Sequence, residues 1–156
     1  MEDTGETAIG ALLAALRATR ENGHEQAVAL PPAFYTDPEM FALECERLFR
    51  GQWHCIARVD ELRQTGDYVA LDLAGEPIVA IRGGDGVLRV LSNVCRHRGT
   101  VLLEGKGQAR TIVCPYHAWS YGTDGALKRA PLMQGAELFD PASCRLPELR
   151  SEVWNG

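Results

Sequence analysis

Two short segments that each pair a cysteine with a histidine constrain this sequence more than any other feature. Cys95–His97 and Cys114–His117 each offer one thiolate and one imidazole, and the 16 residues from Arg98 to Val113 separate the two pairs. Structural zinc sites usually take two cysteines from one knuckle and two histidines from one helix, since a single tetrahedral ion accepts any assignment of its ligands. The mixed pairs in this sequence indicate a different arrangement.

Mixed pairs suit a two-iron cluster in which one iron takes both sulfurs and the other takes both nitrogens, because each loop must then reach both metals. Replacing two anionic thiolates by neutral imidazoles lowers the negative charge of the cluster and makes the addition of an electron easier. Gly99, Gly105 and Pro115 permit tight loop backbones close to the sulfides. We therefore predict a 2Fe-2S cluster, with a structural zinc site as the alternative, and the predicted ligands are Cys95, His97, Cys114 and His117.

The remaining cysteines and histidines show no such pattern. Five cysteines, an odd number, in a chain with no export signal fit poorly with a disulfide framework. Cys45 falls on the apolar face of an expected helix and is interpreted as a small buried hydrophobe. Cys55 and Cys144 have no local ligand partner. His24 and His54 are interpreted as ordinary histidines outside any metal site.

Composition and charge exclude several classes of partner. The 156 residues leave room for one domain and little besides. A mean hydropathy of -0.16 and short apolar runs indicate a water-soluble protein with no membrane span. The first residues are acidic where a signal peptide would be basic, so we expect a cytoplasmic location. A net charge of -5 argues against binding nucleic acid, which takes a clustered basic face.

Two helices are expected before the strands. Over residues 8–20 the apolar side chains recur at i, i+3, i+4 and i+7, which is one face of a helix, and we expect a docking or oligomer helix there. Asp37 is suited to cap a second helix, Pro38 to occupy its first position and Gly51 to close it. The predicted inward face of this second helix holds Phe41, Cys45, Leu48 and Phe49.

From Gly66 onward the apolar period changes to two, which predicts strands over residues 68–73, 77–82 and 87–94. Turn residues at 74–77 and 83–86 separate these segments, so we expect a three-stranded antiparallel meander. A further strand is expected over 111–113, ending at Cys114, and another over 126–128. The second Cys/His pair is therefore predicted near the tip of a hairpin.

The spacing Cys95-x-His97-x16-Cys114-x2-His117 resembles the Rieske motif. The sequence CRHRG followed by CPYHAWSYGTDG is similar to the N-terminal part of Rieske non-haem iron oxygenase large (alpha) subunits, the ring-hydroxylating and demethylating oxygenases. The resemblance covers roughly residues 30–156. It implies a mainly β fold, an antiparallel Rieske sandwich with cluster-binding loops at one end, preceded by two N-terminal helices.

Several residues depart from the high-potential Rieske proteins of cytochrome bc type. Thr100 and Tyr116 stand where those proteins carry a disulfide, so no such disulfide is expected here. Trp119 replaces a serine that donates to a cluster sulfide, which implies a low reduction potential. Tyr121 remains in place to donate to a ligand sulfur, and Trp119 is expected to shield the cluster. Ala118 replaces the glycine usual in the oxygenase family.

The resemblance also implies a domain plan and a function. We expect a helical arm and linker over 1–34, a Rieske domain over 35–150 and the start of a connection to a missing catalytic domain over 151–156. The implied role is to pass single electrons from a ferredoxin or flavin reductase to a mononuclear iron, in a homo-oligomeric (trimeric) oxygenase. No two-histidine, one-carboxylate iron site is expected in this chain, so it should relay electrons without oxygenating. A free-standing Rieske ferredoxin and a zinc-stabilised interaction module are the alternatives, and aromatic rings and quaternary amines are both open as substrates.

Overall fold

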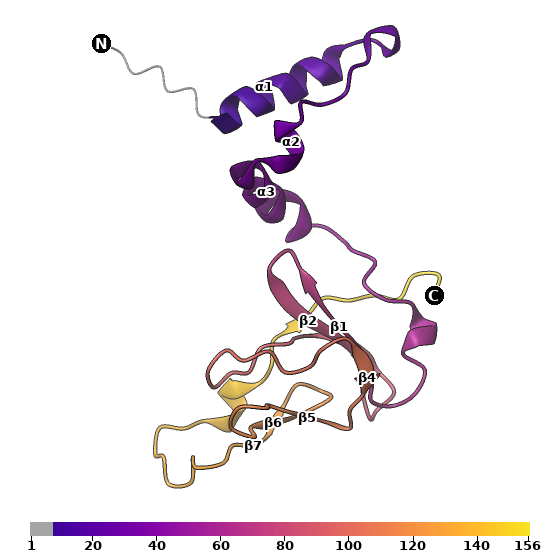
Figure 1. Cartoon of the computed structure of the whole chain (residues 1–156). Helices are drawn as coiled ribbons and strands as arrows, with labels where there is room; N and C mark the ends of the chain where they lie inside the picture. Colours follow the sequence, from indigo (N-terminus) through magenta and orange to yellow (C-terminus); the bar gives the residue numbers. More distant parts are fainter. Residues whose placement is uncertain (1–7) are drawn as a thin grey trace, which may run out of the picture. The chain divides into compact units, whose positions relative to one another are not determined.

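The computed structural model describes residues 8–156 of the chain (Figure 1). The chain divides into two compact units, Met1–Trp53 and His54–Gly156. Helices make up the described part of the first unit, and strands dominate the second (Figure 1). None of the helices within residues 8–156 is long and apolar enough to cross a bilayer.

The first unit consists of short helices around a small apolar cluster. Asp37 caps α3, because its Oδ1 accepts hydrogen bonds from the backbone N–H of Glu39 at 2.9 Å and of Met40 at 3.0 Å. Pro38 occupies the first turn, so this predicted helix start is confirmed. Leu12 of α1 packs with Phe34 and Met40. The elements are α1 (Ala8–Glu21), η1 (His24–Gln26), α2 (Ala33–Thr36), α3 (Pro38–Glu44) and η2 (Cys45–Phe49).

The inward face predicted for the second helix is partly wrong. Cys45 is buried, but 58% of Phe41 and 51% of Leu48 are exposed, while Met40 is buried. In α3 the inward stripe runs through Met40 and its i+3 neighbour Leu43, which leaves Phe41 on another side. From Cys45 the backbone winds as a π-helix, and its wider turn shifts the later side chains away from a 3.6-residue stripe.

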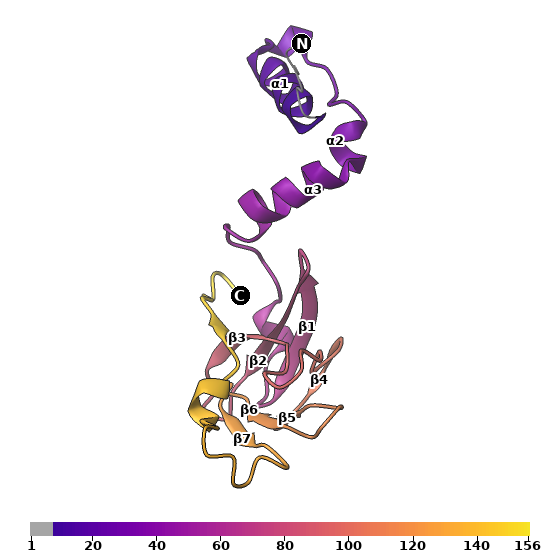
Figure 2. The same cartoon turned by 90° about the vertical axis from the view of Figure 1, so that its left-hand side faces the viewer.

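The second unit contains two antiparallel sheets (Figures 1 and 2). The larger has the order β4-β1-β2-β3-β8, and the smaller has the order β5-β6-β7. The predicted meander is confirmed as β1–β3, with Tyr68 opposite Ile81 and Ala80 opposite Val90. The elements are η3 (Val59–Glu61), β1 (Asp67–Leu73), β2 (Glu76–Arg82), β3 (Leu88–Ser92), β4 (Lys106–Gln108), β5 (Thr111–Val113), β6 (Ser120–Gly122), β7 (Leu127–Arg129), η4 (Pro141–Cys144) and β8 (Glu148–Leu149).

The two hairpin turns of the meander are stabilised in different ways. Ala74 and Gly75 have φ angles of 51° and 86°, as a tight two-residue turn between twisted strands requires. In the next turn Asp85 receives two hydrogen bonds from the guanidinium of Arg89, at 2.9 and 2.7 Å. These bonds, with another from the backbone of Val87, hold the pKa of the Asp85 carboxyl well below its usual range.

Strand β2 is buried on both faces, which explains its nearly continuous apolar sequence. Ile78 and Ala80 pack on one side with Leu62 and Val69. The other face of β2 belongs to a core shared between the two sheets, whose buried members are Val79, Ile81, Leu91, Cys95, Leu102, Ile112, Cys114, Trp119, Tyr121 and Leu146. The second core therefore contains both cysteines of the two Cys/His segments.

Candidate metal centre

The two Cys/His segments fold as loops with the same backbone frame. Cys95–Thr100, the first loop, lies between the bridged residues Val94 and Val101. Cys114–Trp119, the second loop, lies between the paired residues Val113 and Ser120. Each loop has six residues and begins with its cysteine.

The same two hydrogen bonds close each loop. In the first loop the Cys95 N–H donates to the Thr100 carbonyl at 2.8 Å, and the Gly99 N–H donates to the Cys95 carbonyl at 3.0 Å. In the second loop the Cys114 N–H donates to the Trp119 carbonyl at 2.8 Å, and the Ala118 N–H donates to the Cys114 carbonyl at 3.1 Å. The two loops are thus copies of one local structure, and each points its cysteine into the shared core.

Each loop turns through a residue in the left-handed region at its fifth position. Gly99 has a φ of 71° and Ala118 a φ of 56°. Glycine adopts this conformation without steric cost, whereas alanine brings its Cβ close to the backbone. The second loop therefore contains a strained residue where the first loop has none.

The sulfur of Cys95 lies within hydrogen-bonding distance of a hydroxyl. Tyr121, buried in β6, places its Oη 3.3 Å from Cys95 Sγ and accepts a hydrogen bond from the Arg96 N–H at 3.0 Å. Either group can donate when Cys95 is a thiol, but a thiolate can only accept, so the Tyr121 hydroxyl donates to the sulfur once Cys95 is ionised. Burial raises the pKa of Tyr121, and the bond to Cys95 raises it further, so the phenol stays protonated.

The thiol of Cys114 is tuned towards its ionised form. Burial raises its pKa, but the backbone N–H groups of Tyr116 and His117 lower it, with help from the side chains of Cys95 and Thr100. The hydrogen bonds prevail, and the net pKa lies below the usual thiol value. A metal-binding cysteine needs this deprotonated form.

The two imidazoles present nitrogen atoms that lack a protein partner. The Nδ1 atoms of His97 and His117 are both buried and form no hydrogen bond. The two rings lie with centroids 4.8 Å apart at an interplanar angle of 70°. Burial lowers the pKa of His117, as do the nearby charges of His97 and Arg98, which favours the neutral ring that a metal requires. An unpaired buried polar atom is costly, and two of them on neighbouring rings fit a pair of ligands to one iron.

Aromatic rings enclose the histidines. Trp119 is only 3% exposed and stacks on His97 with centroids 4.7 Å apart and planes 6° apart. The Trp119 ring also meets Phe139 edge-on at 5.6 Å. Tyr116 lies against His117 with centroids 3.7 Å apart. Trp119 thus joins the backbone of the second loop to the imidazole of the first, and it screens that imidazole from water.

The structure brings together all six residues singled out from the sequence: Cys95, His97, Cys114, His117, Trp119 and Tyr121. Within residues 8–156, no three His, Cys, Asp or Glu side chains gather as a single-ion site. A two-iron cluster spreads four ligands over two metals, so each iron needs only one pair. The buried thiols and the unpartnered imidazole nitrogens supply such pairs.

The remaining cysteines and histidines differ in burial and in the unit to which they belong. Cys45 is buried in the first unit and Cys55 is exposed. Cys144, the last residue of η4, is partly buried and packs against the core that contains Cys95 and Cys114. His24 belongs to the first unit and His54 to the second.

Sequence reasoning missed Asn93, a buried residue that closes the base of the first loop. Its Nδ2 donates to the Leu103 carbonyl at 2.7 Å, and its Oδ1 accepts from the Leu103 N–H at 3.0 Å. The Asn93 carbonyl also accepts from the Leu102 N–H at 3.0 Å. The Asn93 side chain thus pairs with the backbone of Leu103 as a neighbouring strand would. The only indication in the sequence is an asparagine between a strand and a cysteine.

Comparison with known proteins identifies the family. A model of the Rieske 2Fe-2S domain matches residues 52–145, more than half of the chain and all of both loops. The chain belongs to the Rieske family. Proteins with this domain bind a 2Fe-2S cluster, and the residues described above fit that group.

The relatives of this Rieske chain are oxygenases. It is 41% identical over 133 residues to the carnitine monooxygenase oxygenase subunit of Escherichia coli K12, covering 85% of this chain and 36% of that protein. A solved quaternary ammonium Rieske monooxygenase, described in connection with carnitine oxidation and inter-subunit electron transfer, shares 44% identity and a TM-score of 0.73 over 78% of this chain and 34% of that one. Naphthalene 1,2-dioxygenase with indole in its active site shares 31% identity and a TM-score of 0.73 over 79% and 28%.

These matches confirm the predicted fold class, mainly antiparallel β with few helices, and the resemblance to Rieske oxygenase alpha subunits. A role in electron transfer agrees with them. The Rieske chain spans about a third of the length of the curated relatives it matches.

Proposed function

We propose that the sulfurs of Cys95 and Cys114 bind one iron of a 2Fe-2S cluster, that His97 and His117 bind the other, and that the domain carries single electrons. The observation that carries this proposal is the pair of buried imidazole nitrogens without partners, in twin loops whose cysteines are also buried. When bound, the cluster accepts and releases one electron. The chain's own residues hold it, donate to its sulfur ligand through Tyr121 and exclude water through Trp119.

Metal analysis and mutation test this assignment. Purified protein should contain about two irons and two sulfides per chain and be brown. Cys114→Ser should abolish the visible spectrum, whereas Cys45→Ser, which alters a buried thiol of the other unit, should leave it intact. Colourless protein with one bound zinc would overturn the proposal, as would loss of the spectrum in folded Cys45→Ser protein.

The proposed potential is low. Trp119, Thr100 and Tyr116 occupy the positions at which high-potential relatives carry a sulfide donor and a disulfide, and each hydrogen bond to sulfur stabilises the reduced form. We expect a midpoint of about -150 to -100 mV, near the lower end of the Rieske range. A clearly positive midpoint in a spectroelectrochemical titration at neutral pH would reject this account.

For the whole protein we propose an oxygenase in which this domain passes electrons from a ferredoxin or flavin reductase to a mononuclear iron held by two histidines and a carboxylate. The similarity to carnitine monooxygenase supports a quaternary amine as substrate over an aromatic ring. A homotrimer and a cytoplasmic location complete the proposal. The test couples residues 1–156 to a reductase with NADH: the cluster should be reduced, and neither carnitine nor aromatic acids should be oxygenated by this chain alone. Turnover with a third bound iron would contradict it.

A further inference from the structure

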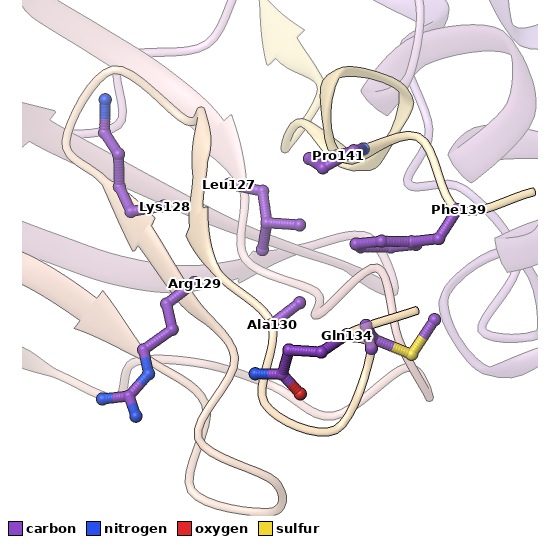
Figure 3. A pocket seen from close by; sticks show the side chains of 8 residues that line it. Leu127, Lys128, Arg129, Ala130, Gln134, Phe139 and Pro141 are labelled. Atoms are coloured by element: carbon purple, nitrogen blue, oxygen red, sulfur yellow. The ribbon is translucent and has the colours of Figure 1, made fainter. Parts of the chain in front are cut away.

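An open pocket of about 210 Å³ lies beside β7 in the second unit (Figure 3). Leu127, Ala130 and Phe139 face the space, whereas Lys128 and Arg129 extend away from its rim (Figure 3). The remaining lining residues are Met133, Gln134 and Pro141. The pocket therefore has an apolar interior with cations at one edge.

One wall of this pocket continues into the candidate metal centre. The Phe139 ring meets Trp119 edge-on, and Trp119 stacks on His97. Leu127 and Met133 also pack against the core that contains both predicted cysteine ligands. An occupant of the pocket would thus lie two ring contacts from His97.

The size of the pocket points to a single side chain as its occupant. Sites for small molecules and cofactors commonly measure about 300–1,000 Å³, so this pocket is smaller than such a site requires. Apolar anchors inserted into small pockets supply much of the energy of protein interfaces. Leu132 and Leu138, which precede the lining residues Met133 and Phe139 in the chain, are 92% and 100% exposed.

Charge indicates the kind of protein that would bring this anchor. Arg129 lies opposite Ser120 in the small sheet, and Ser120 directly follows Trp119 in the chain. Arg129 forms no ion pair within residues 8–156. Arg96 and Arg98 of the first loop are exposed and likewise form none within the described part of the chain. These arginines stand out in a chain of net charge -5. Exposed cations around an apolar contact attract an acidic partner and raise its rate of association.

We propose that the pocket receives an apolar side chain of an acidic iron-sulfur electron-donor protein of the ferredoxin class. This inference rests on the proposed electron-transfer function and adds the donor's docking site. In the transfer, the reduced donor loses one electron and the oxidised cluster of this chain gains it, with no bond made or broken. The transfer is downhill, because four-cysteine plant-type ferredoxins have potentials of about -400 mV and Rieske clusters lie higher.

Binding to an oxidised plant-type ferredoxin, which carries no electron to transfer, tests the docking site by calorimetry at low ionic strength. Arg129→Glu should weaken binding about tenfold by reversing a charge at the rim. Ala130→Trp should fill the pocket and weaken binding about thirtyfold. Arg110→Glu is the matched control: it reverses an exposed arginine that precedes β5, at the end of that strand away from Cys114, and should bind like the wild type.

The rate of cluster reduction supplies a second measurement. The two pocket variants should be reduced more slowly by the reduced ferredoxin but at the wild-type rate by sodium dithionite, which needs no docking. Wild-type binding by both pocket variants would overturn the proposal, and so would equal weakening by Arg129→Glu and Arg110→Glu, which would indicate a general charge effect. A change of oligomeric state with unchanged ferredoxin binding would assign the pocket to a contact between copies and would overturn it as well.

The proposed function fails in a different way. Protein that holds no cluster, or whose cluster dithionite does not reduce, would contradict electron transfer itself. The docking site alone would be contradicted if dithionite reduces the cluster while the pocket variants bind ferredoxin as the wild type does.

Discussion

The two Cys/His loops share a backbone but differ in nearly every side chain. Both span six residues between paired neighbours, and both close with the same two hydrogen bonds. Yet the histidine is the third residue of the first loop and the fourth residue of the second. His97 therefore matches Tyr116 in the common frame, and His117 matches Arg98.

This difference shows how a repeated local structure can serve an asymmetric cluster. Identical frames direct both cysteines into the core, which suits an iron held by two sulfurs. With this one-residue offset the two imidazoles meet edge-on, and both carry buried, unpartnered nitrogens. Side-chain position on the frame, rather than the frame itself, then decides where each loop places its imidazole.

The largest effect is expected when the histidine of the first loop is moved by one position. The double change His97→Arg with Arg98→His gives the first loop the histidine position of the second. We expect nearly complete loss of the cluster's visible absorbance with the far-ultraviolet circular dichroism unchanged, because the loop backbone closes without its side chains. An unaltered visible spectrum would show that the histidine position within the frame is unimportant.

The second largest effect should come from removing the aromatic link between the loops. Trp119→Ala deletes the ring that stacks on His97 and meets Phe139, and truncation of a buried tryptophan costs about 3–5 kcal/mol of the free energy of unfolding. Chemical denaturation measures this loss. Trp154→Ala, which truncates a tryptophan that is 85% exposed, is the matched control and should cost little. Equal costs for both would contradict a structural role for Trp119.

A smaller effect, on the reduction potential, should come from removing the hydroxyl beside the sulfur of Cys95. Tyr121→Phe removes the donor to Cys95. A hydrogen bond to a charged acceptor contributes about 1.5 kcal/mol, and only the part that is stronger in the reduced cluster counts, so the potential should fall by at most about 60 mV. The sign follows because the lost bond stabilised the more negative, reduced cluster. Tyr116→Phe, at a residue that is 59% exposed, should leave the potential unchanged. A rise in potential for Tyr121→Phe would refute the assigned direction of the hydrogen bond.

The smallest effect concerns the left-handed residue of each loop. A Cβ added at Gly99 meets no atom within 4 Å, so Gly99→Ala tests backbone strain alone and should cost about 1 kcal/mol. Ala118→Gly should recover up to about 1 kcal/mol in the second loop. Thermal unfolding of both variants measures the two values. Destabilisation by Ala118→Gly would mean that its methyl group contributes more than its strained backbone costs.

Local chemistry made parts of this structure predictable from sequence. The alternation of apolar residues predicted the meander, and Asp37 followed by Pro38 predicted the start of α3. The two Cys/His segments and Tyr121 were singled out by spacing and resemblance, and the structure brings them together. The ligand assignment itself stays a prediction.

Features that depend on distant contacts were not predictable. Strand β4 is exposed along its length and carries no apolar alternation, because it lies at a sheet edge where short, polar strands are usual. The stacking of Trp119 on His97 joins two loops, and no spacing within one loop specifies it. The π-helical turn at Cys45 likewise disrupted the expected helical stripe.

The hydrogen bonds of Asn93 bear on how a cluster could enter the first loop. Its amide holds the backbone at Leu103 by two hydrogen bonds, and the loop above it is closed by two more, none of which involves a metal ligand's side chain. The backbone of the first loop can therefore be set by bonds that need no iron. Cluster insertion would then require little change in the backbone of this loop.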